Sequence, residues 1–263
     1  MAADMATPDS FARRLRARER LTGYWFSCDN PVAVERIARL GYDYIGVDGQ
    51  HGVLSQPGWN AAMMAVDAGQ RAAGLIRVPS VDPVAIGAAL DTGARGVIVP
   101  MVETPEQAET AVRATKHWPA GTRSLAGPVR AQFRLGDVPA EIDEGVVCIV
   151  MIETKAALDN LDKICATPGL DAVYLGPADL SVALGGHYFG DPEVQPALVE
   201  ASNAIAGAAR DAGIASGIHC MDGESAARWL SDGYTFATIS SDITHLEQVA
   251  AMHLAGARGA EAS

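Results

Sequence analysis

Side chains that suit acid–base chemistry or metal binding stand directly after several apolar segments of this 263-residue chain. Each segment is short enough for a β-strand, and the polar residues that follow are Asp48 with His51, Arg77, Glu153, Asp179, and Ser241 with Asp242. Because the carboxyl ends of parallel strands meet at one end of a barrel, these side chains are expected to converge. A cluster of carboxylates, one histidine and one arginine can move protons and stabilise a negative charge.

Glu153 and Asp179 are the pair that we expect to bind a metal. Two carboxylates without nearby His or Cys ligands suit a hard divalent cation, Mg²⁺ or Mn²⁺, which takes oxygen ligands and keeps water or substrate oxygens in its shell. Other interpretations stay open. Asp179 is also placed to cap the following helix, Glu153 to form an ion pair with Arg77, and a charged residue after a strand is often the start of a solvated loop.

The elements that would position these residues alternate regularly along the chain. Strands are predicted at residues 23–27, 44–48, 73–78, 96–102, 147–153, 172–176, 215–220 and 236–240. Most are apolar throughout, which is typical of strands buried on both faces of a parallel sheet. Helical segments between them often begin near Pro or Asp and end at Gly. The pattern predicts an α/β fold in one domain over residues 1–263, a (β/α)₈ TIM barrel, with a doubly wound open sheet as the alternative.

Two segments are expected to lack regular structure. Residues 118–146, rich in Arg, Gly and Pro, are interpreted as a loop over the site or a subunit contact. Residues 256–263 are predicted to form a disordered tail.

Composition excludes several classes of partner. The formal net charge of −12 disfavours nucleic acid and anionic membranes, because both attract basic surfaces. The first 20 residues contain no apolar core of a signal peptide, and no apolar run approaches the ~20 residues of a membrane-spanning helix. The four cysteines form no CxxC pair. We therefore expect a cytoplasmic protein that binds neither nucleic acid nor membrane.

The motifs GYDYIGVDGQHG, IRVPSVDP, GVIVPMVETPEQAETAV, IVMIET and VYLGPADLSVALG occur in this order along the chain. Together they resemble the metal-dependent, class II pyruvate aldolases of the HpcH/HpaI family, which includes 2,4-dihydroxyhept-2-ene-1,7-dioate aldolase and 2-dehydro-3-deoxyglucarate aldolase. The resemblance extends over residues 23–254 and implies an enzyme, a carbon–carbon lyase, that makes or cleaves 4-hydroxy-2-oxoacids. Its partners would be a 2-oxoacid, pyruvate or hydroxypyruvate, and an aldehyde.

The resemblance also assigns roles to individual residues. Glu153 and Asp179 would hold the divalent metal, Mg²⁺ or Mn²⁺ with Co²⁺ as a further candidate, and no organic cofactor is implied. Backbone N–H groups at Ala178 and Asp179 would bind the substrate carboxylate, and Arg77 would reach its C2 oxygen. His51 would be the acid–base residue, acting directly or through a metal-bound water. Because a carboxylate can fix the tautomer of an imidazole, Asp48 is expected to orient the His51 ring through a hydrogen bond.

The chain departs from the family pattern at two positions. Gln50 stands where many members have Glu, and Met151 stands where the sugar-acid aldolases have a Gln that contacts the substrate. The loss of that amide predicts a less polar acceptor pocket, for a small or hydrophobic aldehyde. Arg123 and Arg130 are candidates for the site or for a neighbouring subunit, or form surface ion pairs.

Alternative functions follow from the same resemblance. The citrate lyase β-subunit and malyl-CoA lyase branch shares the barrel and the acidic pair but cleaves CoA thioesters. A catalytically silent barrel that binds an oxoacid is the other alternative. Relatives are usually hexamers built from dimers that exchange the last helix, so a homo-oligomer, a trimer of dimers, is expected.

Overall fold

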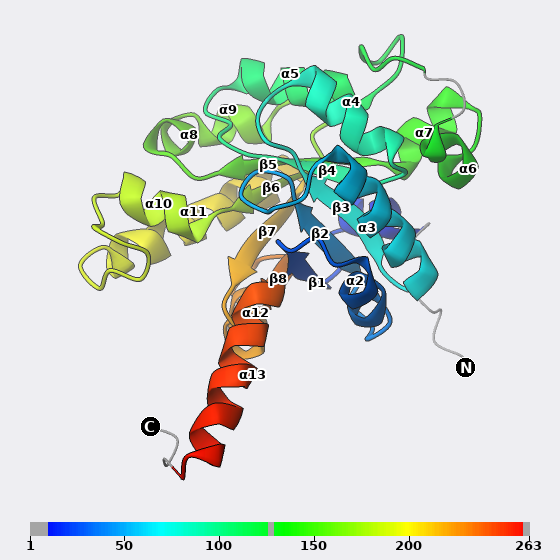
Figure 1. The fold of residues 1–263 in the computed structure, drawn as a ribbon. Coiled ribbons are helices and arrows are strands. Elements are labelled where there is room, and N and C mark those ends of the chain that lie inside the picture. The colour runs from blue at the N-terminus through cyan, green and yellow to red at the C-terminus, as the bar shows by residue number, and fades with distance from the viewer. Residues whose placement is uncertain (1–9, 126–128, 260–263) are drawn as a thin grey trace, which may run out of the picture.

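A computed structural model of the chain, which describes residues 10–125 and 129–259, contains a closed barrel of eight parallel strands (Figure 1). Each strand pairs with the next along the chain, and β8 closes on β1. The strands are β1 Leu21–Phe26, β2 Tyr44–Asp48, β3 Ala73–Arg77, β4 Gly96–Val99, β5 Val147–Ile152, β6 Ala172–Leu175, β7 Ala215–Cys220 and β8 Phe236–Ser241. The predicted (β/α)₈ TIM barrel, a single domain, is confirmed.

Helices cover the outside of the barrel. They are α1 Phe11–Arg16, α2 Pro31–Ala38, α3 Gln56–Gly69, α4 Pro83–Asp91, α5 Pro105–Thr115, α6 Arg130–Leu135, α7 Pro139–Gly145, α8 Lys155–Asp159, α9 Leu161–Cys165, α10 Pro177–Ala183, α11 Gln195–Ala212, α12 Gly223–Ser231 and α13 Asp242–Ala257. Several begin with proline, whose fixed φ and missing N–H suit the first helical turn. The expected irregular stretch at 118–146 contains α6 and α7, so that prediction is wrong over their residues.

Alternate strand residues form two separate cores. One set, which includes Tyr44 of β2 and Leu75 of β3, points into the barrel and packs with α1 through Phe11. The other set, which includes Ile45 and Ile76, packs against the surrounding helices. This alternation follows from the two-residue period of a strand. The last inward-facing residue of each strand therefore lies nearest the carboxyl end of the barrel.

The C-terminal helix α13 differs from the others. Figure 1 shows it (red) extending away from the barrel, and none of its residues is buried. It contacts mainly β8 and β1. Of the predicted disordered tail, residues 256 and 257 belong to this helix, and 260–263 lie outside the described residues. Within the described part of the chain, no helix is long and apolar enough to cross a membrane.

Candidate active site

A cavity of about 280 Å³ lies at the carboxyl ends of the strands. Five predicted site residues line it: His51, Arg77, Glu153, Ala178 and Asp179. They come from four separate segments, after β2, at the end of β3, after β5 and after β6. The structure thus brings together residues that are far apart in the sequence, as expected for a barrel of parallel strands.

Asp48 and Arg77 form a buried ion pair at the floor of this site. They are direct neighbours in the register between β2 and β3. Arg77 Nε donates to Asp48 Oδ1 at 2.9 Å, and Nη2 donates to Oδ2 at 2.6 Å. Burial alone would raise the pKa of Asp48, but the hydrogen bonds and charge of Arg77 and two backbone N–H groups outweigh it and lower the pKa. The guanidinium also lies over the Trp25 ring, 5.1 Å from its centroid. Arg77 is therefore fixed from two sides.

The expected hydrogen bond between Asp48 and the His51 ring is not formed. Asp48 Oδ1 instead accepts the backbone N–H groups of Gln50, at 3.0 Å, and His51, at 3.2 Å. The reason is that the carboxylate oxygens are already used, in the bidentate ion pair with Arg77 and by the backbone N–H groups of the turn after β2. The turn is tight, since a Cβ at Gly52 would lie 2.3 Å from the Asp48 carbonyl oxygen. Asp48 thus positions the His51 backbone, while the exposed ring faces the cavity.

Glu153 is buried beside the cavity with one oxygen unused. Its Oε1 accepts the N–H of Met101 at 2.7 Å, whereas Oε2 has no hydrogen-bond partner among the described residues. Met101 has φ 55°, a left-handed conformation that is costly for a residue with a side chain. Burial raises the pKa of Glu153, and the charge of Asp179 adds to the rise, while the Met101 N–H and Arg77 oppose it. The expected alternative, an ion pair between Glu153 and Arg77, is not formed.

Asp179 lies in the first turn of α10 with its side chain exposed. The N-cap of this helix is Gly176, so Asp179 does not cap it. Asp179 lines the same cavity as Glu153 and is close enough for its charge to affect the Glu153 pKa. The pair leaves two carboxylates facing one space, with no cation of the described chain between them.

The residues present fit a hard divalent cation. A buried carboxylate oxygen without a partner is costly unless a cation or a proton meets it. Gly176 keeps this space open, because a Cβ there would lie 2.5 Å from Glu153 Oε2. No group of three or more His, Cys, Asp or Glu side chains in residues 10–125 and 129–259 is arranged to hold a metal. An ion at this pair would therefore take its other ligands from substrate and water, as Mg²⁺ commonly does.

Sequence reasoning missed three aromatic residues that the barrel strands direct into the cavity: Trp25, Tyr174 and His219. Trp25 stacks on Tyr174 at 6.4 Å and meets the edge of His219 at 5.8 Å. The signal that could have found them is strand parity. His219 is two residues after Gly217 and four after the inward-facing Ala215, so it must also point into the barrel. The apolar part of the lining includes Phe189 and Met221.

Asp242 belongs to the scaffold and not to the cavity. Its two oxygens accept the backbone N–H groups of Ser27, at 2.9 Å, and Cys28, at 3.0 Å. It therefore ties the end of β1 to the start of α13. Its neighbour Ser241 does line the cavity.

Comparison with known proteins identifies the family. The sequence profile of the HpcH/HpaI aldolase/citrate lyase family matches residues 21–248, which is most of the chain. The chain belongs to the HpcH/HpaI family. This confirms the resemblance expected from the sequence motifs.

Two curated relatives of the chain are named as aldolases. The chain is 43% identical over 185 residues to the 4-hydroxy-2-oxovalerate aldolase of Novosphingobium aromaticivorans, covering 69% of this chain and 70% of that protein. It is 32% identical over 241 residues to the 5-keto-4-deoxy-D-glucarate aldolase of Shigella dysenteriae, covering 90% and 91%. The predicted enzyme class, a carbon–carbon lyase of the aldolase type, is confirmed.

Several solved structures have the same fold as this chain. A family protein from Burkholderia cenocepacia matches with a TM-score of 0.88 at 33% identity, covering 95% of this chain and 99% of that one. Macrophomate synthase matches with a TM-score of 0.85 at 25% identity, covering 96% and 89%. The citrate lyase β-subunit of M. tuberculosis matches with a TM-score of 0.57 at 17% identity, covering 86% and 93%, which shows the fold alone.

Met151 and Gln50, which were expected to depart from the pattern of the HpcH/HpaI family, lie in different places. Met151 is buried and lines the cavity, where it contributes apolar surface as expected from the sequence. Gln50 lies in the turn before His51 and has a buried, unpartnered Oε1. Arg123 and Arg130, the two arginines that were candidates for the site, do not line the cavity. Arg130 pairs with Asp67, which also pairs with Arg134 at 2.7 Å.

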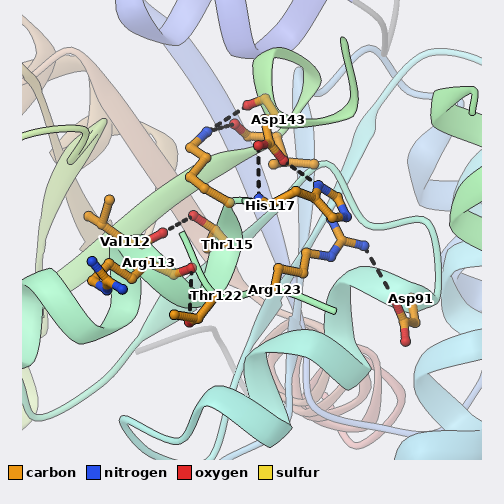
Figure 2. Close-up of polar contacts among 10 residues, drawn as sticks. Asp91, Val112, Arg113, Thr115, His117, Thr122, Arg123 and Asp143 are labelled. Atoms are coloured by element: carbon orange, nitrogen blue, oxygen red, sulfur yellow. Dashed lines mark hydrogen bonds and ion pairs between the residues drawn. The ribbon is translucent and has the colours of Figure 1, made fainter. Parts of the chain in front are cut away.

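Arg123 is buried in a polar cluster between α4, α5 and α7. Figure 2 shows its guanidinium directed toward Asp91, which it contacts at 3.3 Å. His117 and Asp143 form a second pair in the cluster, with 2.6 Å between Nδ1 and Oδ1. These contacts join the segment after α5 to its neighbouring helices.

Proposed function

We propose that this protein is a metal-dependent, class II pyruvate aldolase that makes or cleaves 4-hydroxy-2-oxoacids. The observation that carries the proposal is the unpartnered, buried Oε2 of Glu153, which shares one cavity with Asp179, Arg77 and His51. Glu153 and Asp179 would hold Mg²⁺ or Mn²⁺, with Co²⁺ as a further candidate. When bound, the ion supplies Lewis-acid stabilisation of charge on the substrate oxygens.

Arg77 is proposed to stabilise the charge that develops during carbon–carbon cleavage. In the cleavage direction, the proton leaves the C4 hydroxyl, the C3–C4 bond breaks, and the aldehyde departs. The electron pair passes into the enolate of pyruvate, whose negative charge is on the C2 oxygen. A guanidinium held in place by Asp48 and Trp25 is already oriented toward this charge and needs no reorganisation.

His51 is proposed to move the protons. Its ring faces the cavity from the turn after β2, and the hydrogen bonds from that turn to Asp48 hold the backbone in place. In cleavage it takes the proton of the C4 hydroxyl, and the enolate is then protonated at C3 to give pyruvate. In synthesis the same transfers run in reverse.

The substrate carboxylate is proposed to bind at the start of α10. N–H groups in the first turn of a helix have no carbonyl partner within it, and those of Ala178 and Asp179 lie at the cavity wall. Lys155, the first residue of α8, is not among the residues lining the cavity. This supports enolate chemistry at a metal over an imine at a lysine.

The acceptor is proposed to be a small aldehyde. Met151, Met221 and Phe189 contribute apolar surface to the cavity. One relative is named for 4-hydroxy-2-oxovalerate and the other for a sugar acid. The apolar lining favours the first type, so 4-hydroxy-2-oxovalerate is the substrate to test first.

CoA-ester cleavage is the alternative function. It would need cations for the diphosphate of CoA, whereas the positively charged residue lining the described cavity is Arg77, with His51 and His219 as the histidines. The chain is also strongly acidic. These features support the aldolase over a CoA-ester lyase.

We also propose that the protein is a homo-oligomer in which α13 docks on a second copy, consistent with a trimer of dimers. The support is the unburied apolar surface of this helix, where Leu246 is 71% exposed and Met252 is 56% exposed. A cytoplasmic location stays a prediction.

The test measures pyruvate released from 4-hydroxy-2-oxovalerate by coupling to lactate dehydrogenase. Protein treated with EDTA should be inactive and should recover with Mg²⁺, Mn²⁺ or Co²⁺. Glu153→Gln should remain inactive, while Glu103→Gln, which alters a carboxylate outside the cavity, should behave as wild type. Activity that is indifferent to EDTA, or cleavage of malyl-CoA without cleavage of any 4-hydroxy-2-oxoacid, would contradict the proposal.

A further inference from the structure

His219 lies in the cavity without a role in the chemistry described above. It is an inward-facing residue near the end of β7. Its ring is perpendicular to Trp25, with 5.8 Å between the centroids and 85° between the planes. The ring is therefore held in place by packing against Trp25, whose face is in turn covered by Arg77.

The ring is neutral and has unused hydrogen-bonding capacity. Burial, together with the nearby charge of Arg77, lowers the pKa of His219 to about 4, while the charge of Asp48 opposes the shift. A neutral imidazole has one nitrogen that donates and one that accepts. Its one hydrogen-bond contact in the described chain is between Nδ1 and the Tyr174 hydroxyl at 3.5 Å, at the limit of a hydrogen bond. Tyr174 donates its own proton to Thr238 at 2.6 Å, so it offers His219 only an acceptor.

The unused hydrogen-bonding capacity of the His219 ring lies in mostly apolar surroundings. Much of the nearby cavity surface is apolar, with Trp25, Met151, Met221 and Phe189 in the lining. A polar group in such a place is poorly satisfied until a ligand meets it, and it then discriminates strongly between ligands that can and cannot form the bond. An apolar residue would suit the pocket better if the substrate were apolar throughout.

We propose that His219 is a specificity-determining residue that hydrogen-bonds a hydroxyl group on the carbon next to a reacting carbonyl. This inference rests on the proposed function. Two substrates can supply this hydroxyl: a donor such as hydroxypyruvate, or a hydroxyaldehyde acceptor such as glycolaldehyde. The neutral ring serves either one, because a hydroxyl both donates and accepts.

The experiment compares substrates that differ by this hydroxyl within each variant. For the donor, NMR in D₂O gives the rates of metal-dependent proton exchange at C3 of hydroxypyruvate and of pyruvate. For the acceptor, kcat/KM is measured for condensation of pyruvate with glycolaldehyde and with propanal, which is similar in size. The variants are His219→Leu, which removes the polar group, and His219→Asn, which retains one. His187→Leu is the control, since its exposed side chain does not line the cavity.

Each comparison is a ratio, so a general loss of activity cancels. In one of the two comparisons, the donor arm or the acceptor arm, His219→Leu should reduce the preference for the hydroxylated substrate by about three- to tenfold. His219→Asn should restore part of that preference, and His187→Leu should leave it unchanged. The arm that responds identifies the source of the hydroxyl.

Two results overturn the inference in different ways. Ratios within twofold of wild type in both arms for His219→Leu and His219→Asn would show that His219 does not select the hydroxyl. Absence of metal-dependent exchange in the wild-type protein with either donor would instead refute the proposed function, and the inference with it.

Discussion

Replacing Asp48 with asparagine tests whether the buried ion pair at the end of β2 positions Arg77 for chemistry. The side chains of Arg77 and Asp48 are only 10% and 3% exposed, and two short hydrogen bonds join them. Removing one partner from a buried pair costs about 3–5 kcal/mol. Because asparagine keeps the shape and one acceptor oxygen, we expect a loss of about 2–4 kcal/mol in the free energy of unfolding.

The effect on activity should exceed the effect on stability. Without its counterion, the guanidinium loses the orientation that places it toward the C2 oxygen. Loss of one pre-positioned donor to a developing oxyanion lowers the rate by about 100-fold or more. The assay is metal-dependent exchange of the pyruvate methyl protons, measured at a temperature where urea titration shows the variant to be folded.

The same strand provides a matched control at its other end. Asp43 stands just before β2 and pairs with Arg14 at 2.7 Å, with side chains 16% and 17% exposed. Asp43→Asn should lower stability by about 1–2 kcal/mol and change the exchange rate by less than about twofold. If Asp48→Asn is folded and exchanges pyruvate as fast as Asp43→Asn, Arg77 is not positioned by Asp48 and the reasoning fails.

Three further predictions concern a cavity glycine, a helix glycine and a partly buried histidine. Gly176→Ala should weaken Mn²⁺ binding, measured by electron paramagnetic resonance, at least about tenfold, because the new Cβ would lie 2.5 Å from Glu153 Oε2; unchanged affinity would contradict the metal site. Gly87→Ala, where a Cβ meets nothing within 4 Å, should leave Mn²⁺ binding unchanged and raise stability by about 0.5–1 kcal/mol in urea titration. The pKa of His219 falls from 6.5 to about 4 on folding, so the unfolded chain binds more protons between these values and stability falls as pH drops through this window. At pH 5 this difference in pKa lowers the free energy of unfolding by about 2 kcal/mol. Between pH 7.5 and pH 5, His219→Leu should therefore lose about 2 kcal/mol less stability than the wild-type protein. Equal losses in the two proteins would show that the ring is not held as a neutral group in the folded state.

The strands could be predicted because each is apolar over most of its length. β2, at Tyr44–Asp48, and β7, at Ala215–Cys220, have the predicted bounds. β4 was predicted to extend to residue 102 but ends at Val99, where the chain turns so that Met101 can donate to Glu153. Apolar composition does not encode that turn.

Short helices were missed for a related reason. α6 at Arg130–Leu135 and α7 at Pro139–Gly145 have only six and seven residues. Helices of this length are not stable by themselves and depend on packing against the rest of the protein. Their sequences therefore resemble loops.

The sequence predicted that these side chains would converge, and most of them line one cavity, but it did not predict their pairing. Asp48 and His51 are close in the sequence, which suggested a bond between their side chains. The register between β2 and β3 instead places Arg77 directly beside Asp48. This contact between neighbouring strands joins residues 29 positions apart, so the residues around Asp48 in the sequence do not predict it.

The most direct test of the account is metal-dependent enolisation of pyruvate. Metal-stripped protein is incubated with pyruvate in D₂O, and the methyl proton signal is followed by NMR before and after addition of Mg²⁺ or Mn²⁺. The account predicts exchange only with metal, and its loss in both Glu153→Gln and His51→Ala. Exchange that proceeds equally without metal, or that survives in Glu153→Gln, would contradict the assignment of Glu153 and Asp179 as the metal pair.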